Sequence, residues 1–158
     1  MENNFETKLA ILEDILSKKR QALLTILNIC ENQETLYSTP ATNERREFLL
    51  EMGKQKQMKI DEVLTCDQMF QQIFDSIGDV FESKGQDFPD SVIALQDGIK
   101  ELLEIDVKIR AQEEKTKTAA TSSWGKLDTV ATKEANPATT NEMLNKYRNN
   151  NRNRPHSK

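Results

Sequence analysis

The stretch FETKLAILEDILSKKRQALLTILNIC, residues 5–30, decides the fold. Its large apolar side chains recur in alternating steps of three and four residues, which places them along one stripe of an α-helix. This stripe, called here the first seam, consists of Leu9, Leu12, Leu16, Leu23, Ile26 and Cys30. The same rhythm returns twice and fades after about Lys117. The sequence therefore predicts long helices that associate along apolar seams.

The two later seams place two more helices in the chain. They consist of Met52, Val63, Cys66, Phe70, Ile73, Ile77 and Val80, and of Val92, Leu95, Ile99, Leu102 and Ile109. Capping residues and prolines set the expected boundaries: 3 or 4 to 36, 42 or 43 to 83, and 89 to 117. The expected fold is all-α: an elongated antiparallel three-helix bundle or coiled-coil hairpin, with residues 1–118 as its body.

Polar residues interrupt the seams, and apolar residues lie beside them. Lys19, Lys56, Lys59 and Asp106 fall on seam positions, where polar side chains set register and leave a loosely packed spot. Conversely, each helix has more apolar residues than a two-stranded seam would bury. Either three helices share one core, or an apolar face is left for a partner.

Residues 119–158 form the expected flexible tail. Thr, Ala and Ser dominate its first half, where Trp124 is either a partner anchor or an incidental aromatic. Near 140–149 a short amphipathic segment opens with capping-box spacing and places Met143, Leu144 and Tyr147 on one face. It is either a recognition helix or a chain end without a role.

The charge distribution argues against a body that binds nucleic acid. Residues 141–158 carry five Lys/Arg and one Glu, whereas the other 140 residues carry 17 Lys/Arg and 25 Asp/Glu. Phosphate contacts require clustered cations, which this acidic body lacks. The basic tail alone could contact anions weakly, so no nucleic-acid partner is expected.

The residues needed for common enzyme chemistry are missing. The single histidine, His156, lies in the tail, and the five glycines form no phosphate-binding loop. Adjacent carboxylates such as Glu113 and Glu114 point to different sides of a helix and are expected to face solvent. We therefore expect that the protein is not an enzyme and that it has no catalytic or metal-binding residues, no cofactor and no small-molecule substrate.

The sequence also predicts a cytoplasmic location. The N-terminus lacks the basic start and apolar stretch of a signal peptide, and no run approaches the roughly 18 apolar residues of a membrane span. No stable membrane insertion is expected. Cys30 and Cys66 are most simply small buried hydrophobes, although a disulfide between the first two helices is geometrically possible.

The order of motifs resembles the FlgN-type flagellar export chaperones of clostridial bacteria over roughly residues 5–118. The similarity rests on ENQETL at 31–36, KQMKIDEVL at 56–64, DQMF at 67–70, IALQDGI at 93–99 and IRAQEEKTK at 109–117. The resemblance implies a cytosolic chaperone of the flagellar type III secretion system. Such a chaperone binds hook-associated (hook-filament junction) proteins and delivers them to the export apparatus.

The resemblance also implies where partners bind. By similarity, the third helix and the tail carry the cargo contacts, and Tyr147 is the candidate for contact with the export gate. The expected cargo-binding residues are Leu102, Ile105, Ile109, Met143 and Leu144. The alternative left open is a self-associating coiled-coil protein with a structural or scaffold role.

Overall fold

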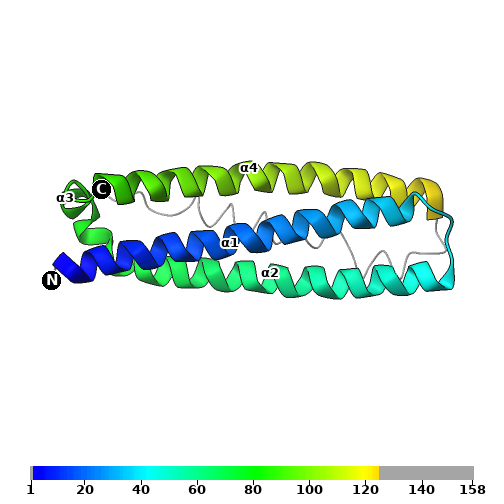
Figure 1. Ribbon diagram of the computed structural model, residues 1–158, viewed down its shortest axis with the longest axis horizontal. Helices are drawn as coiled ribbons and strands as arrows, with labels where there is room; N and C mark the ends of the chain where they lie inside the picture. Colours follow the sequence, from blue (N-terminus) through cyan, green and yellow to red (C-terminus); the bar gives the residue numbers. More distant parts are fainter. Residues whose placement is uncertain (1, 125–158) are drawn as a thin grey trace.

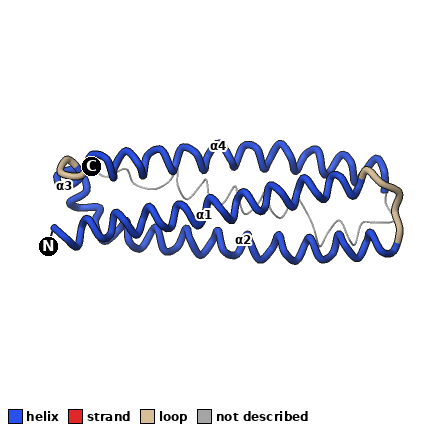
Figure 2. The backbone as a smooth tube through the Cα atoms, viewed as in Figure 1, coloured by secondary structure: helices blue, strands red, loops and turns tan. Residues whose placement is uncertain are grey.

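A computed structural model describes residues 2–124 of the chain. The all-α prediction is confirmed: three long helices are joined by short connections (Figures 1 and 2). They are α1 (Glu2–Tyr37), α2 (Asn43–Ile77) and α4 (Pro89–Ala119). The 3₁₀ turn η1 (Gly78–Val80) and the short α3 (Phe81–Gly85) link α2 to α4, and the π-helical turn η2 (Ala120–Trp124) follows α4.

The bundle is elongated, and α1 is its central helix. With 36 residues, α1 extends about 54 Å at 1.5 Å per residue. In Figure 1 the chain runs along α1, back along α2 and forward again along α4, so α1 and α4 point the same way and α2 opposes both. α1 packs along both other long helices, whereas α2 and α4 do not pack closely along each other.

Local sequence explains where the helices begin and end. The side chain of Thr42 caps α2 by accepting a hydrogen bond from the backbone N–H of Arg45 at 3.2 Å. Pro89 occupies the first turn of α4, as expected. The expected continuation of the second helix to residue 83 was wrong, because the α-helix gives way to a 3₁₀ turn at Gly78.

The main core runs between the three long helices, and α1 supplies about half of it. All six residues of the first seam are buried. The main core consists of Phe5, Leu9, Leu12, Leu16, Ala22, Leu23, Ile26, Cys30, Ile60, Val63, Ile77, Leu95, Leu102, Ile105 and Ile109. Near the N-terminus, Phe5 packs against Phe81 and Phe88, with ring centroids 6.3 and 5.8 Å away.

α1 and α4 come close at Gly98. A Cβ atom at this position would lie 3.1 Å from Cδ1 of Leu16, tighter than ordinary van der Waals contact. The missing side chain therefore lets α4 approach the first seam at this level.

The ordered body extends beyond the expected boundary at residue 118. α4 ends at Ala119, and η2 continues to Trp124, which is only 5% exposed. A second, smaller cluster, called here the end core, consists of Tyr37, Leu49, Ala120 and Trp124. The expectation that residues 119–124 belong to a flexible tail is corrected, since Trp124 has an apolar site on the body.

Candidate functional site

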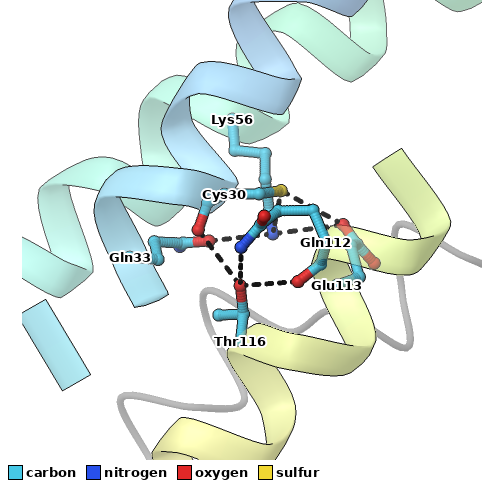
Figure 3. Close-up of polar contacts among 6 residues, drawn as sticks. All are labelled: Cys30, Gln33, Lys56, Gln112, Glu113 and Thr116. Atoms are coloured by element: carbon cyan, nitrogen blue, oxygen red, sulfur yellow. Dashed lines mark hydrogen bonds and ion pairs between the residues drawn. The ribbon is translucent and has the colours of Figure 1, made fainter. Parts of the chain in front are cut away.

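The three long helices meet at a buried polar cluster within the bundle, shown in Figure 3. This polar layer consists of Cys30, Gln33, Lys56, Gln112, Glu113 and Thr116. The Nζ atom of Lys56 lies 3.4 Å from Oε1 of Glu113 and donates to Oε1 of Gln33 at 3.2 Å. The two charged side chains are only 3% and 0% exposed. The layer therefore joins α2 to α4 through one buried ion pair and α2 to α1 through the hydrogen bond to Gln33.

The remaining polar groups tie α1 to α4. The hydroxyl of Thr116 lies 3.0 Å from the backbone carbonyl oxygen of Cys30 and 3.0 Å from that of Gln112, and it can donate a hydrogen bond to either one. Gln112 donates from Nε2 to Oε1 of Glu34 at 2.8 Å. These bonds satisfy side chains that would otherwise be buried at a cost of about 1–3 kcal/mol each. The cluster is therefore built for alignment of helices.

The thiol of Cys30 belongs to the same layer and is held in its protonated form. Its sulfur lies 3.5 Å from Oε1 of Glu113 and 3.8 Å from Nζ of Lys56. Burial, supported by the Glu113 carboxylate and opposed by Lys56, raises the pKa of Cys30 to about 12. Because the thiolate is the nucleophilic form, this cysteine is suited to packing and unsuited to covalent chemistry.

The disulfide left open by the sequence does not form. Cys30 and Cys66 are both free thiols. Cys30 lies at the level of Lys56, and Cys66 is ten residues further along α2, about 15 Å away. A disulfide requires Cα atoms within about 7 Å, so the two cannot be bridged in this register.

A second, part-buried charge pair links α1 to α2. The ammonium of Lys19 pairs with Oδ1 of Asp67, and the Lys19 side chain is 3% exposed. Burial lowers the pKa of Lys19 to about 8, although Asp67 and, more weakly, Asp106 act in the opposite direction. Asp106 is itself buried, with Nε of Arg110 3.8 Å from its Oδ2. Three of the four polar seam residues are therefore buried; Lys59 alone is half-exposed.

Glu113 corrects the expectation that adjacent carboxylates face solvent. Its neighbour Glu114 is exposed, but Glu113 is only 1% exposed. Sequence reasoning also missed Gln33, Gln112 and Thr116. One signal was available: Glu113 lies seven residues after the seam residue Asp106, on the same stripe of the helix.

A different part of α4 is exposed and apolar. Ile99, Leu103 and Val107 follow one another at intervals of four residues and have exposed fractions of 39%, 43% and 61%. This spacing places them on one continuous surface, called here the α4 ridge. The third seam included Ile99 as a core residue, and that part of the prediction was wrong.

The α4 ridge borders the side of α4 that faces α2. Ile99, Asp106 and Glu113 are spaced by seven residues and share a stripe, and Glu113 contacts Lys56 of α2. Because α2 and α4 do not pack closely, the residues of this stripe are covered unevenly. The exposure of Ile99 follows from that separation of the two helices.

Trp124 fastens the end of the bundle. Its indole Nε1 donates a hydrogen bond to the carbonyl oxygen of Thr39, in the α1–α2 connection, at 2.7 Å. The ring also meets Tyr37 edge-on, with centroids 5.1 Å apart. Of the two interpretations left open for Trp124, an anchor and an incidental aromatic, the structure favours an anchor, but one that binds the chain's own body.

The expected site residues fall into two groups. Leu102, Ile105 and Ile109 are 2%, 5% and 0% exposed and belong to the main core, so no partner reaches them in this arrangement. Met143, Leu144 and Tyr147 lie outside the described residues. The α4 ridge is the exposed apolar surface beside the first group.

In comparisons with known proteins, no family model, curated protein or solved structure matches the chain. None of the helices described between residues 2 and 124 combines the length and apolar character needed to cross a membrane. Within the same residues, no three His, Cys, Asp or Glu side chains are grouped as a metal site.

Proposed function

We propose that the protein is a flagellar export chaperone that binds hook-associated proteins in the cytosol and delivers them to the type III export gate. In this proposal an amphipathic helix of the cargo lies along the α4 ridge. The protein acts by binding, without chemistry on its cargo. The similarity of its motifs to FlgN-type chaperones suggests the cargo class, and the exposed ridge supplies the surface.

The exposure of Ile99, Leu103 and Val107 is the observation that carries the proposal. Helix-binding proteins present an apolar surface on which a partner helix lays residues spaced three and four apart. Fully burying one such aliphatic side chain contributes about 1.5–3 kcal/mol. Ile99, Leu103 and Val107 are already about half covered, so covering the rest of these side chains contributes about 2–4 kcal/mol. Micromolar binding corresponds to about 8 kcal/mol and therefore also needs the apolar side chains of the cargo helix and contacts beyond the ridge.

The proposal moves the cargo contacts from the predicted residues to their neighbours. Leu102, Ile105 and Ile109 hold α4 to the other helices, and Leu103 directly follows the first of these core residues. In this arrangement the core side of α4 stabilises the bundle while its ridge binds cargo. Met143 and Leu144 then extend the cargo contact from the tail, and Tyr147 contacts the export gate.

The test is a titration of the full chain against fluorescently labelled C-terminal segments of hook-associated proteins. Binding in the micromolar range is expected. Leu103→Lys should weaken it at least about tenfold, because a charged side chain replaces an apolar contact worth more than about 1.4 kcal/mol. Met58→Lys is the matched control, since Met58 is also exposed, at 65%, but lies on α2 away from the ridge.

Two results would count against the proposal. The first is the absence of binding at micromolar concentrations of every such segment. The second is equal binding by the Leu103→Lys and Met58→Lys chains, which would place the contact elsewhere. Circular dichroism of both variants confirms that each retains its helices.

Self-association is the second candidate function. It is favoured by large apolar side chains exposed on the other helices, Ile11 at 40%, Phe48 at 55% and Met69 at 43%. A scaffold that uses these residues would form a stable homo-oligomer, whereas the chaperone proposal expects free ridge surface on a single chain. Sedimentation equilibrium separates the two, because only the scaffold sediments as a large species at micromolar concentration.

A further inference from the structure

We propose that the amphipathic segment at residues 139–149 binds the α4 ridge of its own chain. The ridge offers Ile99, Leu103 and Val107 as exposed apolar side chains, and the segment offers Met143, Leu144 and Tyr147. Residues 139–149 lie outside the described part of the chain. The association is supported by the reach of the linker, the lengths of the segment and the ridge, and the opposite charges of tail and body. We assign the ridge to the segment of the same chain because the body holds the start of this tail in place at Trp124.

The tail can reach the ridge from its fixed starting point. Trp124 is held in the end core by its hydrogen bond to Thr39 and its contact with Tyr37. Leu103 lies 21 residues before Trp124, about 32 Å back along the helix. The 14 residues between Trp124 and Thr139 extend to about 46 Å, so the linker exceeds the required distance without needing full extension.

The dimensions of the two surfaces also agree. The ridge extends over nine residues of α4, about 12 Å from the first to the last, and the 11 residues at 139–149 would form a helix of about 16 Å. A helix this short is marginal in water by itself. An apolar partner surface therefore supplies the stabilisation that the segment lacks.

Charge favours the same association. Residues 1–124 carry 15 Lys/Arg and 23 Asp/Glu, a net charge of −8, whereas residues 141–158 carry a net charge of +4. Opposite net charges raise the local concentration of the tail near the body. The attraction is long-range and has no strict register, so the apolar side chains would decide where the segment binds.

The inference stands apart from the proposed function but gives it a regulatory consequence. If cargo also binds the α4 ridge, the tail and the cargo compete. The apparent affinity for cargo then equals the affinity of the open ridge multiplied by the fraction of chains whose ridge is open. That consequence rests on the proposed function. The docking itself is testable in the absence of cargo, so the two can fail separately.

The experiment measures paramagnetic relaxation in the full chain. A nitroxide is attached at Lys100→Cys, an exposed position beside Ile99, in a chain with Cys66→Ser; Cys30 stays because it is fully buried. The amide signals of residues 139–149 should lose intensity relative to the reduced label. Adding Leu103→Lys should restore that intensity, and adding Met58→Lys should not.

Three outcomes would overturn the proposal. Unchanged tail intensities would show that the segment does not approach the ridge. Restoration by Met58→Lys as well as Leu103→Lys would show that charge alone drives the approach. Finally, a loss of tail intensity in a mixture of isotope-labelled chain without nitroxide and unlabelled chain with nitroxide would show that the segment binds the ridge of a second copy.

Discussion

Glu113→Gln should destabilise the bundle by about 3 kcal/mol. The substitution preserves the size of the side chain and leaves Lys56 with a neutral partner, so the buried ammonium loses its charged neighbour. Breaking a buried ion pair by removing one partner costs about 3–5 kcal/mol.

The expected loss of stability in Glu113→Gln lies at the lower end of the range of about 3–5 kcal/mol for a structural reason. The new amide oxygen can still accept from Nζ of Lys56, and Oε1 of Gln33 already does so at 3.2 Å. The ammonium group of Lys56 therefore retains hydrogen bonds and loses mainly its electrostatic attraction to the carboxylate. A domain of this kind has a total stability of about 5–15 kcal/mol, so the change is easily measured.

The assay is urea unfolding at pH 7, followed by circular dichroism, for the wild type and Glu113→Gln. Glu114→Gln is the control, because Glu114 is the exposed neighbour and its substitution should change the free energy of unfolding by less than about 0.5 kcal/mol. A third chain, Lys56→Met with Glu113→Leu, removes both charges and should be as stable as the wild type or more so. A Glu113→Gln chain as stable as the control would refute the reasoning.

Three further predictions follow from other buried groups. Burial lowers the pKa of Lys19 from 10.5 to about 8. Between these two pH values the unfolded chain binds more protons than the folded chain, so the free energy of unfolding should rise by about 3 kcal/mol from pH 8 to 10.5 relative to Lys19→Met. Urea titration of both chains at each pH measures this rise. Burial raises the pKa of Cys30 from 9 to about 12, so the folded chain binds more protons there; stability should fall between pH 9 and 12, and less steeply in Cys30→Ala. Trp124→Phe removes the hydrogen bond to Thr39 and should cost about 1 kcal/mol in the same urea assay, whereas Trp124→Ala should cost about 3–5 kcal/mol.

The helices and the first seam could be predicted because they depend on local signals. The seven-residue rhythm identifies a buried stripe without knowledge of the partner helix, and α1 buries that stripe against two helices at once. Thr42 and Pro89 mark helix starts by their own backbone chemistry. These signals are local, so they predict the same helix starts and the same buried stripe in any tertiary arrangement.

The candidate site could be predicted only in part, because exposure depends on how far apart two helices lie. Ile99 and Glu113 occupy the same stripe of α4, yet the apolar residue is 39% exposed and the charged one 1% exposed. Glu113 is buried because Lys56 of α2 reaches it, and Ile99 is exposed because α2 does not close over it. Neither fact is encoded in the neighbouring residues. Trp124 was recognised as a possible partner anchor, but its contact with Thr39, 85 positions earlier in the same chain, could not be predicted from its polar neighbours.

The buried charges constrain helix register. A seam of apolar residues that repeats every seven positions can realign after a slip of seven residues, about 10.5 Å, with little loss of apolar contact. The two ion pairs oppose that slip, because Lys19 meets Asp67 between α1 and α2 while Lys56 meets Glu113 between α2 and α4. A slip of α1 or α2 breaks the contact between Lys19 and Asp67. A slip of α4 that brings Asp106 opposite Lys56 replaces one carboxylate with another, but it breaks the bonds of Gln112 and Thr116 to α1. Buried ion pairs contribute little net stability but can select one alignment. We infer that they do so here, together with the bonds of Gln112 and Thr116 to α1.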